Sequence, residues 1–172
     1  MGRDKGSLPL HGKTLVEHVA CAVAEAAGSV TLVGAPERYQ GLGFPILPDS
    51  RPGAGPLAGI HTALAASSAD WNLIAACDMP LVSAPFFKLL LAAAESSGAH
   101  CLIPSGPSGL PEPLCAVYHR RALAGLQAHF ARGTRKVTVA LESLATVSLE
   151  VSEVALFQNL NTPEDWLAHA GE

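Results

Sequence analysis

The chain has 172 residues, a length that fits one domain with a sizeable hydrophobic core. Hydrophobic residues make up 49% of it and charged residues only 15%, which excludes an intrinsically disordered protein. The net charge is −4 and no basic stripe is present, so nucleic-acid binding has no electrostatic support. No apolar run reaches the length of a membrane span, and no signal-peptide pattern opens the chain.

The cysteines and histidines give no metal-binding pattern. The four cysteines are widely spaced and form no CxxC pair, and the seven histidines form no pair at metal-ligand spacing. Cys77 and Cys101 lie in or beside apolar strand patterns, so we expect buried, reduced thiols and a cytoplasmic protein. No local motif marks a Ser/His/Asp or Cys/His catalytic arrangement either.

The first third of the chain predicts a basic loop, a helix and two short strands. The loop over residues 1–13 carries Lys5 and, taken alone, has the character of a solvated tail. A helix is predicted over residues 14–28, because Thr14 and Glu17 form a capping-box pattern and a glycine ends the apolar periodicity. Short strands are predicted over residues 30–33 and 44–47.

A glycine-rich loop then runs into a helix over residues 51–66. Gly53, Gly55 and Gly59 have the spacing GxGxxxG, one residue longer than the dinucleotide fingerprint, which disfavours a Rossmann dehydrogenase. Pro56 suits the first position of the helix. Amides exposed at this helix start could meet a phosphate or a base edge, or could simply form a helix cap, and the spacing leaves both open.

An apolar run over residues 73–77 ends abruptly in Asp78. Because Pro80 then adds a turn signal, the run predicts a fully buried central strand of the kind found in parallel sheets. Ligands of open parallel sheets bind just beyond the carboxyl ends of the strands. Asp78 therefore stands where a metal ion or a cationic substrate group is expected, the alternative being a loop aspartate that caps the next helix or faces water.

The second half alternates strands with helices. Helices are expected over residues 83–97 and 120–132 and from Thr162, and strands over 100–103, 114–118 and 146–151. Glu112, in the Gly/Pro-rich loop before residue 114, is expected to be solvated. The turn over residues 133–136 is basic, and it predicts either a salt-bridged helix start or an anion site.

This alternation, without repeats or linkers, predicts a single α/β domain over residues 1–172. The expected architecture has three layers, a mostly parallel sheet with helices on both faces. The long loop over residues 104–113 and the strands after it suggest an antiparallel excursion within that sheet.

Five segments together resemble the molybdenum cofactor guanylyltransferase family, whose fold is a Rossmann-like nucleotidyltransferase sheet. The first is Met1-Gly-Arg-Asp-Lys5 with Leu8-Pro-Leu-His-Gly-Lys13, which is similar to the later part of the signature LAGGxSxRMGxDKxxLxxxGxxL. The others are Gly55-Pro-Leu-Ala-Gly59, Cys77-Asp-Met-Pro80, Gly133-Thr-Arg-Lys136 and Asn159-Leu-Asn-Thr-Pro-Glu-Asp165. They cover essentially the whole chain in the family's order.

The resemblance implies a reaction and a set of site residues. The family transfers GMP from magnesium GTP to the terminal phosphate of molybdopterin bearing molybdenum, and it releases pyrophosphate. By this resemblance Asp78 binds magnesium and Lys5 neutralises phosphate charge, which makes these two the catalytic residues. The implied nucleotide contacts are Lys5, Asp49, Gly55, Pro56, Leu57, Ala58, Gly59 and Asp78, and the implied acceptor contacts are Asn161, Arg135 and Lys136.

The choice of guanine rests on two segments, the GPLAG loop and the ending Asn159 to Asp165. Cytidylyl relatives tend to carry a different glycine loop and an aspartate where Asn161 stands. As partners, the resemblance implies GTP and molybdopterin, together with molybdoenzymes or proteins that deliver the cofactor.

The family signature begins with a strand and the motif LAGGxSxR. The given sequence starts at Met1 and does not include this first part of the signature. We expect the natural protein to be longer, because a central strand and the loop that would cradle the triphosphate are otherwise missing. Two alternatives stay open. One is a nucleotidyltransferase of the same fold with another base or acceptor, such as a cytidylyltransferase, and the other is a non-catalytic nucleotide-binding relative.

Overall fold

The computed structural model describes residues 5–10 and 12–160. Its α-helices are α1 (Leu15–Ala27), α2 (Pro36–Tyr39), α3 (Pro56–Ala66), α4 (Ala84–Ser97), α5 (Ala122–Ala131) and α6 (Val137–Leu141), and its 3-10 turns are η1 (Lys5–Ser7) and η2 (Val154–Phe157). Its strands are β1 (Pro9–Leu10), β2 (Lys13–Thr14), β3 (Leu32–Val33), β4 (Ile46–Leu47), β5 (Trp71–Ala75), β6 (Cys101–Ser105), β7 (Cys115–His119) and β8 (Thr146–Glu150). None of the described helices is long and apolar enough to cross a membrane.

The strands form one four-stranded sheet and two small pairs. The four-stranded sheet has the order β5-β7-β6-β8, in which β7 is antiparallel to both neighbours and β6 is parallel to β8. Strand β3 pairs in parallel with β4, and β1 forms an antiparallel hairpin with β2. The antiparallel excursion expected after the long loop is therefore confirmed, and β7 is the strand that makes it.

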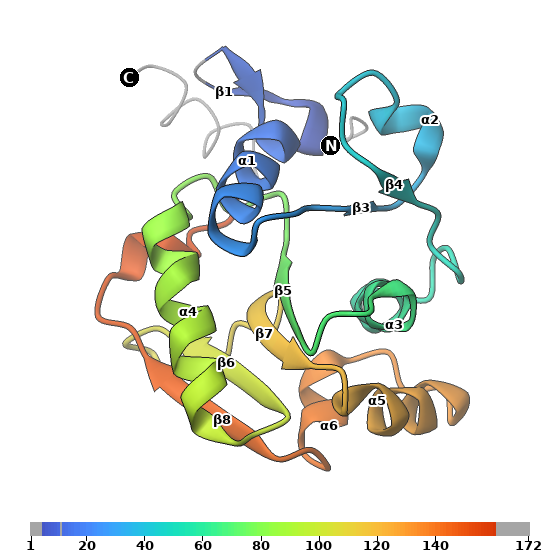
Figure 1. Ribbon diagram of the computed structural model, residues 1–172, viewed down its shortest axis with the longest axis vertical. Helices are drawn as coiled ribbons and strands as arrows, with labels where there is room; N and C mark the ends of the chain where they lie inside the picture. The colour runs from blue at the N-terminus through green and yellow to red at the C-terminus, as the bar shows by residue number, and fades with distance from the viewer. Residues whose placement is uncertain (1–4, 11, 161–172) are drawn as a thin grey trace.

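Helices cover both faces of the sheet, as Figure 1 shows with α1 and α4 on one side and α3, α5 and α6 on the other. Side chains of the strands alternate between the two layers. On β6, Leu102 packs with the α1/α4 cluster, whereas Cys101 and Ile103 pack with the α3/α5/α6 cluster. Because alternation with period two is what a sheet between two helical layers requires, the three-layer α/β architecture expected from the sequence is confirmed.

The expectation of a fully buried central strand is wrong for β5 within the described residues. All five residues of β5 are only half-buried, and β5 lies at the edge of the four-stranded sheet. The apolar run pairs antiparallel with β7, from Trp71 opposite His119 to Ala75 opposite Cys115. The apolar composition of the run predicted that β5 is at least partly buried, but it could not predict which strands would pair with β5.

The cysteines agree with the expectation of reduced thiols. Within the described residues none of the four forms a disulfide. Cys101 and Cys115 are buried and Cys21 is exposed, whereas Cys77, which was expected to be buried, is only half-buried. Burial raises the pKa of the Cys101 and Cys115 thiols to about 12, so both stay protonated at neutral pH and are poor nucleophiles.

Local signals set the helix ends. Thr14 caps α1 with both halves of a capping box, since its Oγ1 accepts from Glu17 N at 3.4 Å while Glu17 Oε2 accepts from Thr14 N at 2.8 Å. Gly28 ends α1 in the left-handed region, with φ of 77°. At α4 the Oγ of Ser83 accepts from Phe86 N at 3.5 Å, without the second half of a capping box, and Gly98 ends the helix in the left-handed region with φ of 65°. These ends were all predicted from sequence.

Thr14→Ala is expected to lower the free energy of unfolding at pH 7 by about 1 kcal/mol, because it removes the side-chain half of this capping box. Urea unfolding, monitored by circular dichroism, measures this change in the free energy of unfolding. Thr138→Ala, an exposed change on α6, serves as the matched control and is expected to have no such effect.

The cost of Thr14→Ala should also depend on pH. The hydrogen bond from the Thr14 hydroxyl, followed by the one from its amide, holds the pKa of Glu17 below the usual 4.5. A lowered carboxyl pKa stabilises the fold above the unfolded-state pKa, and this contribution is lost as the pH falls through the folded-state pKa. A cost of Thr14→Ala that stays constant from pH 7 down to acid unfolding would contradict the capping-box assignment.

Candidate active site

Asp78 lies just beyond the carboxyl end of β5, the place expected from sequence. The turn is fixed on two sides, since Ala76 N donates to Leu114 O at 2.7 Å and Leu160 N donates to Asp78 O at 2.9 Å. The second bond brings the late segment of the chain to Asp78, although Asn161 itself lies outside the described residues. Next to Leu160, the Oδ1 atom of Asn159 is buried and, within the described residues, has no hydrogen-bond partner. A polar atom left in this way is a position that a ligand or water could satisfy.

The N-terminal turn η1 lies against the same corner. A Cβ atom added to Gly6 would stand 3.3 Å from Cys77 Sγ and 3.2 Å from Tyr39 Oη, so the backbone of Gly6 can approach Cys77 only because it lacks a side chain. Lys5 is in this turn, and its side chain lies outside what the structure describes. The backbone of Lys5 is therefore brought close to the residue that precedes Asp78.

The glycine loop reaches the site through the start of α3. Gly55 is the N-cap of α3 with φ of 87°, and Pro56 takes the first helical position. Leu57 and Ala58 are fully buried in the core, and the Ala58 amide donates to Gly55 O at 3.1 Å. Only the Gly55, Pro56 and Gly59 part of the predicted loop is accessible to a ligand, and Pro56, Gly59 and Asp78 line one groove.

Asp49 ties the loop before α3 to the helix itself. Its Oδ1 accepts from Arg51 N at 3.0 Å and from Thr62 Oγ1 at 3.3 Å, and Thr62 also contacts Ser50 Oγ at 2.7 Å. Within the described residues its Oδ2 makes no hydrogen bond, so one carboxylate oxygen remains for a ligand. Asp49 is thus anchored as part of the loop, and its role toward a nucleotide stays a prediction.

The basic turn before α6 meets the glycine loop. A Cβ atom on Gly55 would stand 3.6 Å from Arg135 O, so two segments about eighty residues apart lie in van der Waals contact. Arg135 and Lys136 are exposed, and neither makes an ion pair within the part of the chain that the structure describes. The sequence left two interpretations of this turn open, a salt-bridged helix start and an anion site. The described residues do not form the salt-bridged helix start.

Sequence reasoning missed Glu112. It was expected to be solvated, but it is half-buried, with its amide donating to Pro104 O at 2.9 Å. Burial, and then the negative charge of Asp78, raise the pKa of Glu112. The carboxylates of Glu112 and Asp78 therefore lie close enough for their charges to interact. No local pattern in the loop could have indicated this proximity, because Asp78 is more than thirty residues away in the sequence.

Arg51 is a second residue that the sequence did not single out. Its guanidinium carbon lies 4.5 Å from the centre of the Phe130 ring, which in turn stacks on His61 at 5.6 Å. This cation–π contact holds the exposed side of the glycine loop against α5.

The donor set fits a hard divalent cation that is held mostly by its substrate. Among the described residues, no group of three or more His, Cys, Asp or Glu side chains could hold a metal ion by itself. Magnesium is commonly bound by one or two carboxylates together with substrate phosphates and water. Asp78, with Glu112 close enough for their charges to repel, offers such a carboxylate site, and a cation would relieve that repulsion.

Comparison with known proteins identifies the family of the chain. Residues 1–147 match the family described as MobA-like NTP transferase domain. The chain is 31% identical to the molybdenum cofactor guanylyltransferase of Vibrio atlanticus, over 95% of this chain and 85% of that protein. It is 34% identical to a probable molybdenum cofactor guanylyltransferase of Methanothermobacter thermautotrophicus, over 96% and 90%.

Solved structures give the same result. Molybdopterin-guanine dinucleotide biosynthesis protein A from Archaeoglobus fulgidus superposes with a TM-score of 0.82 at 30% identity, covering 99% of this chain and 90% of that one. A 2-C-methyl-D-erythritol 4-phosphate cytidylyltransferase from Thermus thermophilus superposes with a TM-score of 0.75 at 21% identity, over 97% and 92%, which shows the fold alone. The chain therefore belongs to the MobA-like NTP transferase domain family and is a nucleotidyltransferase.

Proposed function

We propose that this protein transfers GMP from GTP to molybdenum-bearing molybdopterin, forming the molybdopterin guanine dinucleotide cofactor and releasing pyrophosphate. The observation that carries the proposal is that four segments distant in the sequence lie around the end of β5: two of them reach Asp78 itself, one lies against the preceding Cys77, and one lines the same groove as Asp78. These are the N-terminal turn with Gly6, the start of α3 at Pro56, the loop of Glu112 and the late segment at Leu160. The names of the relatives support guanine as the base and molybdopterin as the acceptor.

Asp78 is the residue we propose to hold magnesium. When bound, the ion would supply positive charge to the phosphate oxygens of GTP, whose negative charge otherwise opposes attack by another phosphate. The protein's own contribution is alignment of the acceptor phosphate with the α-phosphate of GTP, because such a transfer needs no covalent enzyme intermediate. Lys5 would offset phosphate charge from the N-terminal turn.

The remaining predicted residues divide between the two substrates. Asp49 and the accessible backbone of Gly55 to Gly59 are proposed to hold the guanine nucleotide. Asn161, Arg135 and Lys136 are proposed to attract the phosphate of the pterin acceptor. Arg135 lies beside Gly55, so the acceptor side would adjoin the nucleotide side. We place this reaction in the cytoplasm, where the thiols stay reduced.

The proposal is tested by incubating the protein with GTP, magnesium and molybdenum-loaded molybdopterin. We expect pyrophosphate release that requires all three, together with a product heavier than the acceptor by one GMP. Chelation of magnesium should stop both. Pyrophosphate release without a guanylated pterin would refute the acceptor, and GTP binding without any release would support a non-catalytic relative.

A further inference from the structure

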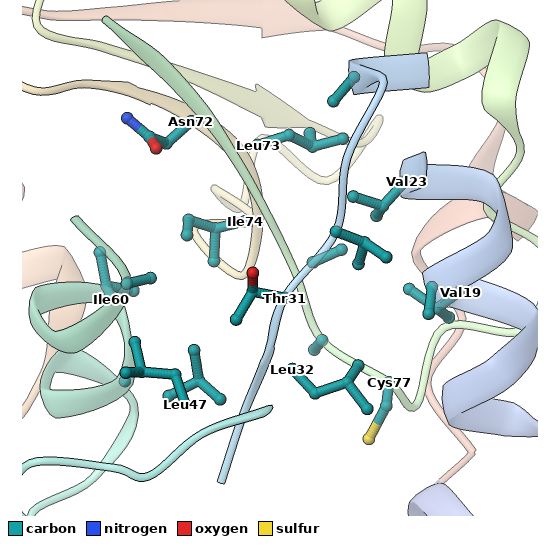
Figure 2. A pocket seen from close by; sticks show the side chains of 18 of the residues that line it. Val19, Val23, Thr31, Leu32, Leu47, Ile60, Asn72, Leu73, Ile74 and Cys77 are labelled. Atoms are coloured by element: carbon teal, nitrogen blue, oxygen red, sulfur yellow. The ribbon is translucent and has the colours of Figure 1, made fainter. Parts of the chain in front are cut away.

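A cavity of about 330 Å³ lies between the loop that joins β6 to β7 and the 3-10 turn η2. It is distinct from the groove at Asp78, because no described residue lines both. Figure 2 shows the apolar walls of that groove, with Val19 and Val23 of α1 on one side and Ile60 of α3 on the other. The smaller cavity differs in having the carboxylate-bearing Glu112 in its wall. Its volume lies at the lower end of the range of small-molecule sites.

The backbone of Glu112 is fixed on both sides. Its amide donates to Pro104 O at 2.9 Å, and its carbonyl accepts from Cys115 N at 3.0 Å. The next residue is held as well, since Tyr118 Oη donates to Pro113 O at 2.7 Å. Tyr118 is fully buried, so this anchor belongs to the core. A carboxylate on a backbone held in this way is positioned to read the geometry of a ligand.

The carboxylate of Glu112 has no partner within the described residues. It accepts no hydrogen bond and forms no ion pair there, although the residue is half-buried. Partial burial of a carboxylate without donors is costly, and two N–H groups in one plane satisfy both of its oxygens best. The proposed reaction assigns Glu112 no contact with either substrate, so this capacity to accept hydrogen bonds is unused.

Phe157 gives the cavity an aromatic wall. Its ring packs edge-to-face on Phe86, with centroids 5.9 Å apart and planes at 71°. A Cβ atom on Gly106 would stand 3.4 Å from Cδ2 of Phe157, so the bare backbone of the loop lies directly against the ring. Val154 and Ala155 of η2 add apolar surface. An aromatic and apolar wall with one carboxylate suits a flat heterocycle that carries hydrogen-bond donors on one edge.

The cavity and the glycine loop lie on opposite faces of the sheet, and Asp78 adjoins both. Leu156 and Phe157 of η2 pack with the α1/α4 layer, whereas α3 packs with the other layer. Asp78 lines a groove with the start of α3, and it is close enough to Glu112 for their charges to interact. A molecule in the cavity would therefore reach Asp78 from the side opposite to the proposed guanine nucleotide.

The heterocycle that matches a carboxylate in this setting is a 2-amino-4-oxopyrimidine ring. Such a ring presents two N–H donors side by side, one on a ring nitrogen and one on the amino group, and a carboxylate accepts both. Guanine and pterin contain the same ring. Position favours the pterin, because the guanine nucleotide is proposed to lie across the sheet, at Asp49 and the start of α3.

We propose that this cavity binds the pterin ring of the acceptor. The Glu112 carboxylate accepts from the ring N–H and from the 2-amino group, and Phe157 packs against the ring. The inference rests on the proposed function, since it takes molybdopterin as the acceptor. It adds recognition of the pterin end to the contacts proposed for the phosphate end.

The kinetic test uses Glu112→Gln, which keeps the length of the side chain but replaces one accepting oxygen with an amide that donates. With GTP, magnesium and molybdenum-loaded molybdopterin, we expect KM for the acceptor to rise at least about ten-fold. KM for GTP and the magnesium concentration that gives the half-maximal rate should change less than about two-fold. The control is Glu153→Gln, the same change at an exposed residue that precedes η2 and does not line the cavity, and it should alter none of the three.

Three results of this comparison would overturn the inference. A rise in KM for GTP in place of the acceptor would put guanine in the cavity. A rise in the magnesium requirement would make Glu112 a metal ligand. Kinetics of Glu112→Gln equal to those of Glu153→Gln would leave the cavity without a part in acceptor binding.

A binding test separates this inference from the proposed function, because it requires no turnover. Pterin is titrated at pH 7 and followed by its own fluorescence, and lumazine, in which oxygen replaces the 2-amino group, is the matched ligand. We expect the parent chain to bind pterin at least about ten-fold more tightly than lumazine, and Glu112→Gln to lose this preference.

The outcomes of the two tests are distinguishable. Equal affinity of the parent chain for pterin and lumazine, or no binding of pterin, overturns the inference even where guanylyl transfer is found. A preference for pterin that depends on Glu112, in a protein that transfers no GMP, supports the cavity as a pterin site and refutes the proposed function alone.

Discussion

Replacing Asp78 with asparagine is expected to lower kcat for pyrophosphate release on the order of a thousand-fold. The carboxylate lies at the carboxyl end of β5 with its backbone fixed by Leu160, so asparagine keeps the shape and hydrogen bonds of the turn while it removes the charge that would hold magnesium. Steady-state pyrophosphate release at saturating GTP measures the effect against the unchanged parent chain.

The control for Asp78→Asn is Asp70→Asn, the same chemical change at the opposite end of β5. Asp70 is exposed and forms a surface ion pair with Arg120 at 3.9 Å, which stabilises a protein by at most about 1 kcal/mol. Asp70→Asn should therefore leave kcat unchanged. Asp78→Asn should leave Tm unchanged or slightly raised, because it removes repulsion with Glu112. Full turnover by Asp78→Asn would exclude Asp78 as the metal ligand.

Gly6→Val is the second change with a large expected effect, a loss in kcat/KM on the order of 100-fold. A Cβ at this position already stands 3.2 Å from Tyr39 Oη and 3.3 Å from Cys77 Sγ, and valine adds two methyl groups to that contact. The turn carrying Lys5 would have to move away from Cys77, at a cost of about 1–3 kcal/mol in stability. GTP kinetics together with urea unfolding separate the two effects.

A graded series distinguishes displacement of the turn from simple unfolding. Gly6→Ala should lose less activity than Gly6→Val, since the ends of the Tyr39 and Cys77 side chains can yield by a few tenths of an ångström. Tyr39→Phe removes the nearest atom and should partly restore Gly6→Val in a double-mutant cycle. Unchanged GTP kinetics in a folded Gly6→Val protein would place the N-terminal turn outside the site.

The parts of the fold that sequence predicted well are those set by neighbours in the chain. The capping box at Thr14, proline at position 56 and the glycine at position 98 act within one helical turn, so each helix end followed from a few adjacent letters. The apolar run before Asp78 was also correctly assigned to a strand, although β5 ends at Ala75, three residues before the carboxylate.

What the sequence could not provide are contacts between distant segments. Half-burial of β5 depends on what stands beside it, and the contact of Gly55 with Arg135 depends on how α3 and α6 pack. Glu112 has no motif of its own, and only the sheet brings it to Asp78. For this reason the sequence could suggest Asp78 as a candidate from its position, whereas it could not suggest the neighbouring carboxylate of Glu112.

The comparison of GTP with CTP tests the central claim most directly. It is made with the protein, magnesium and molybdenum-loaded molybdopterin, and kcat/KM for pyrophosphate release is measured with each nucleotide. We predict a preference for GTP of at least about 100-fold, with guanylated pterin as the product, because hydrogen bonds to a base edge discriminate strongly when left unpaired. Equal use of both nucleotides, or a preference for CTP, would contradict the assignment of this protein as a guanylyltransferase.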